Sequence, residues 1–271
     1  MKIFDKQLLV SDFDGTLVNS KQQISKENLE AIRFFTQNGG LFCGATGRTP
    51  NNIKPFLRGL PFNCPWILFN GACLYDFKTH TIMRMVCLKQ DPIKTILKKI
   101  LALFPSICVQ LYTADKLYLV NPNGNEDKTM VNEKQEFQYE EMEAIKEPWV
   151  KIILHEEHAV LQKLSEAIQK EDKHHNYHVF FSIGTYLEIT HAEVSKGFAL
   201  NLLKEELGSR VLKVIAIGDY LNDLEMLQTA DIKAAPQNAH PKVKSIAHKI
   251  TADHNCHAVA DLIESLSYTL K

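Results

Sequence analysis

Residues 7–75 consist of short apolar runs that alternate with helix-like stretches. The runs cover residues 7–11, 41–45 and 66–69; the first helix-like stretch begins at Ser25 and stops at Gly39-Gly40, and the second covers residues 50–57. Runs that are apolar at nearly every position are typical of strands buried on both faces of a parallel sheet. The β-α-β-α-β order therefore predicts the α/β class, with a parallel sheet covered by helices on both faces.

The pattern changes between residues 83 and 188, where the sequence is more polar. Helical stretches at 92–104 and 159–170 are mixed with alternating runs at 117–120, 150–154 and 179–183, and residues 121–124 have the composition of a turn. The α/β pattern then returns, with a helix at 196–207 and an apolar strand at 211–217. We therefore predict one sheet domain built from residues 1–82 and 189–271, with an α+β domain at 83–188 inserted into it.

The composition is that of a globular protein with a small-molecule partner. Of the 271 residues, 45% are hydrophobic, which provides ample core material. The 31 basic and 32 acidic residues give a net charge of −1, which argues against nucleic acid or an anionic membrane surface as a partner. No apolar segment of signal-peptide length precedes Asp12, and no run approaches the ~18 apolar residues of a membrane span, so we expect a cytoplasmic protein. The six cysteines form no Cys-x-x-Cys pair and are interpreted as reduced core thiols.

Polar groups follow the apolar runs at the positions where strands should end. The first run leads into Asp12-Phe13-Asp14-Gly15-Thr16, which on its own could be an ordinary turn, because Asp, Gly and Thr are common turn residues. Three other segments also place polar groups at strand ends or helix starts: Thr46-Gly47-Arg48, Lys196-Gly197 and residues 218–223. Because ligands bind at the carboxyl ends of parallel strands, we expect these segments to converge on one edge of the sheet.

The charges at that edge do not balance. Four carboxylates, Asp12, Asp14, Asp219 and Asp223, would face one ammonium group, Lys196. Burying such an excess of negative charge without compensation is costly. A divalent cation would offset it, and ligands that are all oxygen atoms favour Mg²⁺ over zinc.

Together these segments resemble the signature of the haloacid dehalogenase superfamily, in the branch of Cof-type phosphatases that carry a large inserted cap. Asp-Phe-Asp-Gly-Thr, Ala-Thr-Gly-Arg, Ser-Lys-Gly and Gly-Asp-x-x-Asn-Asp occur in the family's order, and Asn70-Gly71-Ala72 matches a further segment of this branch. The resemblance covers both ends of the chain, residues 1–82 and 189–271. It implies a Rossmann-like core, and an α+β cap that closes over the site and selects the substrate. The implied activity is magnesium-dependent hydrolysis of a small phosphomonoester, such as a sugar phosphate or a phosphorylated cofactor.

The resemblance also implies a role for each residue of the motifs. Asp12 would attack phosphorus and form an aspartyl-phosphate, and Asp14 would protonate the leaving oxygen and then activate water. Asp12, Asp219 and the main-chain carbonyl of Asp14 would hold Mg²⁺. Phosphate would be bound by Phe13, Thr46, Gly47, Lys196 and Asn222. Arg48 would either contact the substrate or support its loop, and Asp223 would orient Lys196 or a metal-bound water.

The chain departs from the pattern of this branch at two places near the C-terminus. Residues 235–239 contain Pro236-Gln237 where the branch has Met-Gly, so the loop loses a glycine and its conformational freedom. Residues 255–259 contain Cys256-His257 where an acidic Asp-Gly-Val stretch is common. Both departures would touch the rim of the site.

Two alternative functions remain open from the sequence. A phosphotransferase such as a phosphohexomutase would use the same motifs but pass the phosphoryl group to a sugar hydroxyl. A non-catalytic phosphate-binding module would keep the pocket without turnover, although such a module needs no general acid at Asp14. Neither the substrate nor the oligomeric state is predicted.

Overall fold

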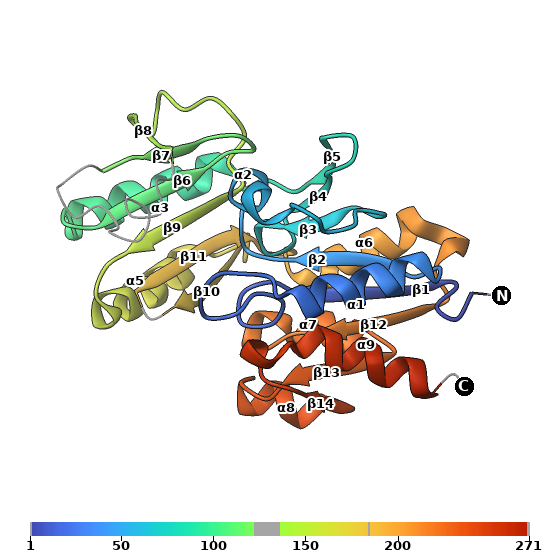
Figure 1. Cartoon of the computed structure of the whole chain (residues 1–271). Helices are drawn as coiled ribbons and strands as arrows, with labels where there is room; N and C mark the ends of the chain where they lie inside the picture. The colour runs from blue at the N-terminus through green and yellow to red at the C-terminus, as the bar shows by residue number, and fades with distance from the viewer. Residues whose placement is uncertain (1, 122–135, 184, 270–271) are drawn as a thin grey trace. The chain divides into compact units, whose positions relative to one another are not determined.

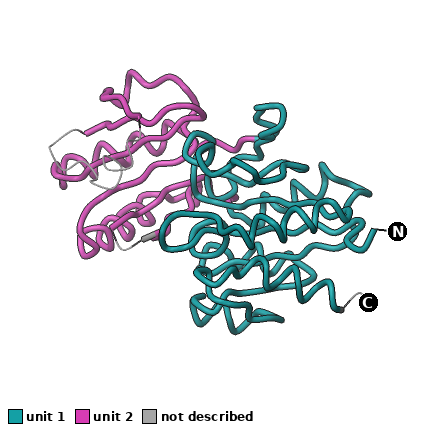
Figure 2. The backbone as a smooth tube through the Cα atoms, viewed as in Figure 1, with its two compact units in different colours: residues 1–84, 195–271 teal, residues 85–194 magenta. Residues whose placement is uncertain are grey.

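The computed structural model describes residues 2–121, 136–183 and 185–269, which form parts of two compact units. One unit contains residues 1–84 and 195–271, and the other contains residues 85–194 (Figure 2). The boundaries expected from the sequence, at 82/83 and 188/189, fall inside the strands β5 (Thr81–Met85) and β11 (Tyr186–His191). Because β11 pairs with β10 along its whole length, the second unit continues to Val194.

The first unit is built on an eight-stranded sheet in the order β14-β13-β12-β1-β2-β3-β4-β5 (Figure 1). Besides β5, its strands are β1 (Gln7–Asp12), β2 (Leu41–Ala45), β3 (Trp66–Leu68), β4 (Cys73–Asp76), β12 (Lys213–Ile217), β13 (Ile232–Pro236) and β14 (Lys249–Thr251). The six strands from β14 to β3 pair in parallel, which confirms the predicted α/β core. Strand β4 pairs antiparallel to β3 and, with β5, extends the sheet beyond the predicted strands.

Helices cover both faces of this sheet (Figure 1). They are α1 (Lys26–Gln37), α2 (Pro50–Ile53), α6 (Lys196–Leu207), α7 (Leu224–Thr229), α8 (Pro241–Ile246) and α9 (Ala258–Thr269). Leu8 and Val10 of β1 share a buried cluster with residues of α6, α7 and α8, while α1 and α9 pack together on the opposite face (Figure 1). The helix predicted at 50–57 continues after α2 only as the 3₁₀ turn Lys54–Phe56, because Pro55 has no N–H to donate.

Capping residues set the ends of α1 and α6, the two long helices of the first unit that the sequence predicted. Ser25 and Ser195 precede α1 and α6, and each hydroxyl accepts a hydrogen bond from the N–H three residues later. Helix α1 stops before Gly39, and α6 stops at Gly208, where the backbone has a positive φ. The side chain of Lys196 therefore leaves the first turn of a helix whose start is fixed by Ser195.

The second unit contains a six-stranded sheet in the order β10-β11-β9-β6-β7-β8. Its remaining strands are β6 (Cys108–Tyr112), β7 (Leu117–Leu119), β8 (Gln138–Tyr139), β9 (Lys151–His155) and β10 (Tyr177–Ile183). The helices α3 (Gln90–Leu103) and α5 (His158–Glu171) bury their apolar sides against alternate residues of β6, β9 and β11. This is the α+β architecture predicted for the insertion. Of the turn predicted at 121–124, all but Asn121 lies outside the described residues.

Across the part of the chain that the structure describes, no helix combines the length and the apolar character that a membrane crossing requires.

Candidate active site

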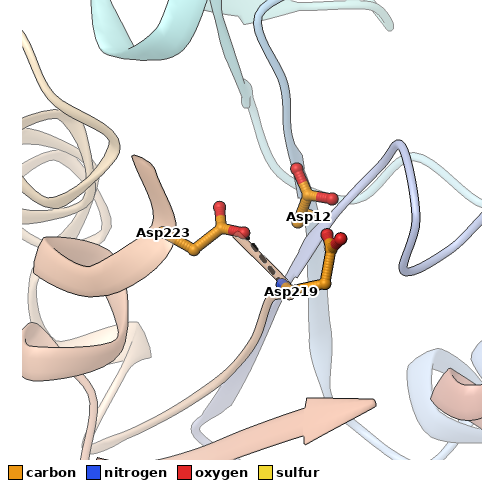
Figure 3. Close-up of side chains that lie close together, drawn as sticks. All are labelled: Asp12, Asp219 and Asp223. Atoms are coloured by element: carbon orange, nitrogen blue, oxygen red, sulfur yellow. Dashed lines mark hydrogen bonds between the residues drawn. The ribbon is translucent and has the colours of Figure 1, made fainter. Parts of the chain in front are cut away.

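Three carboxylates meet at the carboxyl ends of two neighbouring parallel strands (Figure 3). Asp12 is the last residue of β1, and Asp219 and Asp223 follow β12, which pairs with β1. Their ligand atoms lie within 4.8 Å of one another. Gly15 allows this approach: its φ is +82°, and a Cβ atom there would lie 2.6 Å from Oδ2 of Asp219.

Lys196 holds two of these carboxylates. Its Nζ lies 2.5 Å from Oδ1 of Asp12 and 2.6 Å from Oδ1 of Asp223, and the lysine is 1% exposed. Burial by itself lowers the pKa of this lysine, but the charges of Asp12 and Asp223 outweigh burial and raise the pKa above its usual value. Oδ2 of Asp223 accepts a hydrogen bond from the N–H of Asp219 (Figure 3). It also accepts one from the N–H of Tyr220. Lys196 is thus an ammonium group fixed between β1 and the segment after β12.

The remaining negative charge is poorly compensated. Burial raises the pKa of Asp12 well above its usual value, although Lys196 opposes this, and Oδ2 of Asp12 is buried without a hydrogen-bond partner. Burial, with the nearby charge of Asp223, raises the pKa of Asp219 to about 6. Its Oδ1 accepts a hydrogen bond of 3.1 Å from the hydroxyl of Thr16. An unpartnered buried carboxylate oxygen beside two further carboxylates fits a hard divalent cation.

Asn70 joins two segments that were predicted to bind phosphate. Its Oδ1 accepts a hydrogen bond of 3.2 Å from Nδ2 of Asn222, and a Cβ atom on Gly47 would lie 2.9 Å from its Nδ2. Its main-chain N–H also donates to the carbonyl of Thr46. Asn70 was not predicted as a site residue. Its signals in the sequence were its position directly after a buried strand and the match of Asn70-Gly71-Ala72 to a segment of the Cof-type branch.

The backbone around Asn70 is strained. Phe69, Asn70 and Gly71 have φ values of +52°, +55° and +109°, a conformation that is costly for a bulky residue such as phenylalanine. This turn presses against the start of α6, because a Cβ atom on Gly71 would overlap the carbonyl oxygen of Ser195. The turn after β3 therefore contacts the segments that carry Thr46, Asn222 and Lys196.

Asp14 lies apart from the buried carboxylates and is paired with Arg48. Nε of Arg48 donates to Oδ2 of Asp14 at 2.9 Å, and Nη2 donates to Oδ1 at 2.6 Å. The main-chain N–H of Arg48 donates to Oγ1 of Thr46, which follows β2. The ring of Phe13 is fully buried against Phe56, so the predicted phosphate contact of Phe13 rests on its main chain.

The two departures near the C-terminus are accommodated in different ways. Gln237 is exposed and is not among the residues with positive φ, so this loop does not need the missing glycine. His257 does adopt a left-handed backbone, with φ +66°. Between them, Asn238 donates to the carbonyl of Gly15 at 2.8 Å and accepts from the N–H of His254. This loop therefore supports the turn that follows Asp12.

Residues 9–263 match the profile of the haloacid dehalogenase-like hydrolases. The chain belongs to this family. The match spans the first unit and the insertion, so it confirms the resemblance drawn from the four motifs.

Relatives in this family are similar to the chain over nearly its whole length. It is 30% identical to a 5-amino-6-(5-phospho-D-ribitylamino)uracil phosphatase of Bacillus subtilis, with 94% of this chain and 96% of that protein covered. It is 25% identical to a pyridoxal phosphate phosphatase of Escherichia coli, with 96% and 98% covered. A crystal structure of a haloacid dehalogenase-like hydrolase from Bacteroides thetaiotaomicron has a TM-score of 0.84 and 26% identity, covering 96% of this chain and 99% of that one. The chain is therefore an enzyme, a phosphatase of the haloacid dehalogenase-like family.

Proposed function

We propose that this enzyme hydrolyses a small phosphomonoester through an aspartyl-phosphate formed on Asp12. The observation that carries the proposal is the state of the Asp12 carboxylate. One oxygen is held by Lys196 and the other is buried without a partner, at the carboxyl end of β1. A buried carboxylate with one oxygen oriented by Lys196 and the other without a hydrogen-bond partner can offer one oxygen to phosphorus and the other to a divalent cation.

The proposed reaction has two displacements. An Asp12 oxygen forms a bond to phosphorus while the bond from phosphorus to the ester oxygen breaks, and the carboxyl group of Asp14 gives its proton to that departing oxygen. Asp14, now a carboxylate, then takes a proton from water as the water oxygen bonds to phosphorus. The bond from phosphorus to Asp12 breaks, and inorganic phosphate is released.

Residues of the neighbouring segments would bind the transferred phosphoryl group. Thr46, Gly47 and Asn222 are adjacent through Asn70, and their hydroxyl, N–H and amide groups are suitable donors to phosphate oxygens. Lys196 would neutralise part of the charge on both Asp12 and the phosphoryl group. The main chain of Phe13 follows Asp12 directly and is also assigned to phosphate binding.

The donor set supports Mg²⁺ as the cofactor. Asp12, Asp219 and the carbonyl of Asp14 would hold it, with Asp223 orienting Lys196. Bound Mg²⁺ would offset the negative charge of the phosphoryl group in the transition state.

The substrate is proposed only as a class. Two relatives are named for phosphorylated small molecules, a ribitylaminouracil phosphate and pyridoxal phosphate. A sugar phosphate or a phosphorylated cofactor is accordingly the proposed substrate, with residues of the insertion selecting it. Cytoplasmic localisation stays a prediction.

The test is release of phosphate by the purified protein with MgCl₂. Sugar phosphates, pyridoxal phosphate, flavin mononucleotide and nucleotides would be compared, with the Asp12→Asn variant as the control without a nucleophile. We expect turnover by the wild type and none by Asp12→Asn. Turnover retained in Asp12→Asn would contradict the assigned nucleophile. Isomerised sugar phosphate in place of free phosphate would identify a phosphotransferase, and tight binding without turnover would identify a binding module.

A further inference from the structure

We infer that Arg48 is a positioning residue that orients the carboxyl group of Asp14 toward the leaving oxygen. This inference rests on the proposed function and deepens it. The sequence left two roles open for Arg48, contact with the substrate and support of its loop. The inferred role differs from both, because Arg48 would act through the side chain of Asp14.

Arg48 and Asp14 form a bidentate ion pair. Nε and Nη2 of the guanidinium donate to different oxygens of the same carboxylate, at 2.9 and 2.6 Å. Two parallel hydrogen bonds fix the plane of the carboxylate as well as its distance, which a single ammonium contact does not do. The two hydrogen bonds therefore fix the Asp14 carboxyl group with one lone pair of each oxygen toward Arg48, and the proton that Asp14 donates would sit on a remaining lone pair.

The guanidinium is itself held in place. Its Cζ lies 5.5 Å from the centre of the Phe13 ring and 5.0 Å from the centre of the Phe56 ring, within range of cation–π attraction. Nη2 also donates to Oε1 of Gln22 at 2.5 Å. The Arg48 side chain is only 19% exposed. The arginine is thus a rigid support for the Asp14 carboxylate.

Asp14 needs such a support because its own surroundings do not restrain it by burial. Its side chain is 44% exposed, whereas the side chain of Asp12 two residues earlier is 8% exposed. A half-exposed aspartate on a turn can populate several staggered rotamers. A proton donor that is displaced by about an ångström loses much of its catalytic effect.

The chemistry of the leaving group provides a specific test. An alkyl phosphate expels a strongly basic oxygen that needs a proton, while p-nitrophenyl phosphate expels a stable anion that does not. A residue that acts through Asp14 should matter for the first ester and hardly for the second. A residue that binds the phosphoryl group should matter equally for both.

The experiment measures kcat and KM for p-nitrophenyl phosphate and for the best alkyl phosphate of the substrate screen. The variants are Arg48→Lys, Asp14→Asn, the double variant and Arg33→Lys. Arg33 is an exposed arginine whose guanidinium donates to the carbonyl of Gly59, so it controls for the change of residue type. Thermal unfolding of each variant checks that it folds.

We expect Arg48→Lys to lower kcat/KM for the alkyl phosphate by about tenfold or more, and for p-nitrophenyl phosphate by less than about threefold. In the Asp14→Asn background, Arg48→Lys should have no further effect on the alkyl phosphate. Arg33→Lys should match the wild type on both esters.

Equal losses on the two esters, or a full additional loss in the double variant, would overturn the inference and assign Arg48 to phosphate binding or to loop stability. Wild-type protein that hydrolyses neither ester would instead refute the proposed function on which the inference depends.

Discussion

Nζ of Lys196 lies 2.5 Å from Oδ1 of Asp12, and both side chains are buried. The two residues are 184 positions apart in the sequence, one at the end of β1 and the other at the start of α6. Their ion pair, which also includes Asp223, joins the N-terminal and C-terminal parts of the first unit at the carboxyl edge of its parallel strands.

Lys196→Met should strongly destabilise the protein. The change leaves the carboxylates of Asp12 and Asp223 buried without their ammonium partner, and breaking a buried ion pair on one side costs about 3–5 kcal/mol. Urea unfolding at neutral pH measures this cost. Lys26→Met is the matched control, because Lys26 is 82% exposed and its pair with Glu30 contributes at most about 0.5 kcal/mol. Equal costs for the two variants would contradict the account of Lys196.

MgCl₂ should stabilise the wild type through Asp219. Binding to the native state alone raises the free energy of unfolding by about 2.7 kcal/mol when free Mg²⁺ is about 100 times its Kd. Asp219→Asn should weaken this effect at every Mg²⁺ concentration, whereas Asp76→Asn, outside the carboxylate cluster, should not. Thermal unfolding across a MgCl₂ titration gives the measurement. An unchanged titration in Asp219→Asn would remove Asp219 from the metal site.

Without divalent cations, stability should depend on the pKa of Asp219, which is about 6 in the folded protein against an ordinary 3.8. Between these values the folded state binds more protons than the unfolded state, so stability falls as pH rises. The total loss is about 2–3 kcal/mol. In EDTA, Asp219→Asn should therefore be more stable than the wild type at neutral pH, and its advantage should shrink as pH falls through 6. Urea unfolding at several pH values measures it. An advantage that does not vary with pH would contradict the raised pKa.

Gly71→Ala should disrupt the start of α6. A Cβ atom at this position would overlap the carbonyl oxygen of Ser195, in addition to the cost of a positive φ. Gly59→Ala is the control, because Gly59 also has a positive φ but nothing lies within 4 Å of its Cβ position. We expect Gly71→Ala to cost at least about 2 kcal/mol more than Gly59→Ala in chemical unfolding. Similar costs would mean that the turn and α6 move apart easily.

His257→Gly should be more stable than His257→Ala. Both changes remove the imidazole, which lies 3.5 Å from Glu27, but only glycine relieves the left-handed backbone at φ +66°. The expected difference in the free energy of unfolding is about 1 kcal/mol. Differential scanning calorimetry of the two variants checks it. An alanine variant as stable as the glycine variant would show that the backbone relaxes at this site.

Much of the candidate site was visible in the sequence because its residues come from strand ends and from the start of a helix. The prediction that Asp12 and Asp219 would converge followed from the rule that parallel strands share one carboxyl edge. Lys196 was expected there from the start of a helix, and the structure brings these residues together. Thr16 and Asn70 were missed. Thr16 belongs to the Asp-Phe-Asp-Gly-Thr motif but was given no role in it, and the hydrogen bond of its hydroxyl to Asp219 crosses 203 positions of the chain.

The pairing of Asp14 with Arg48 was also outside the reach of sequence patterns. Both residues lie in motifs that the sequence showed. No spacing rule, however, predicts that a given arginine will form a bidentate pair with a particular carboxylate. The guanidinium of Arg48 lies over the rings of Phe13 and Phe56, which come from different segments of the chain. Such a contact exists only after the chain has folded.

The α/β class, the insertion and most of the polar groups at the strand ends were predictable from the sequence, because periodicity and capping are local properties of the chain. Which of those groups are buried, paired or strained follows only from the folded structure. Burial and charge pairing depend on distances between residues that are far apart in sequence. For that reason only the folded protein distinguishes the desolvated Asp12, held by Lys196, from the half-exposed Asp14, held by Arg48.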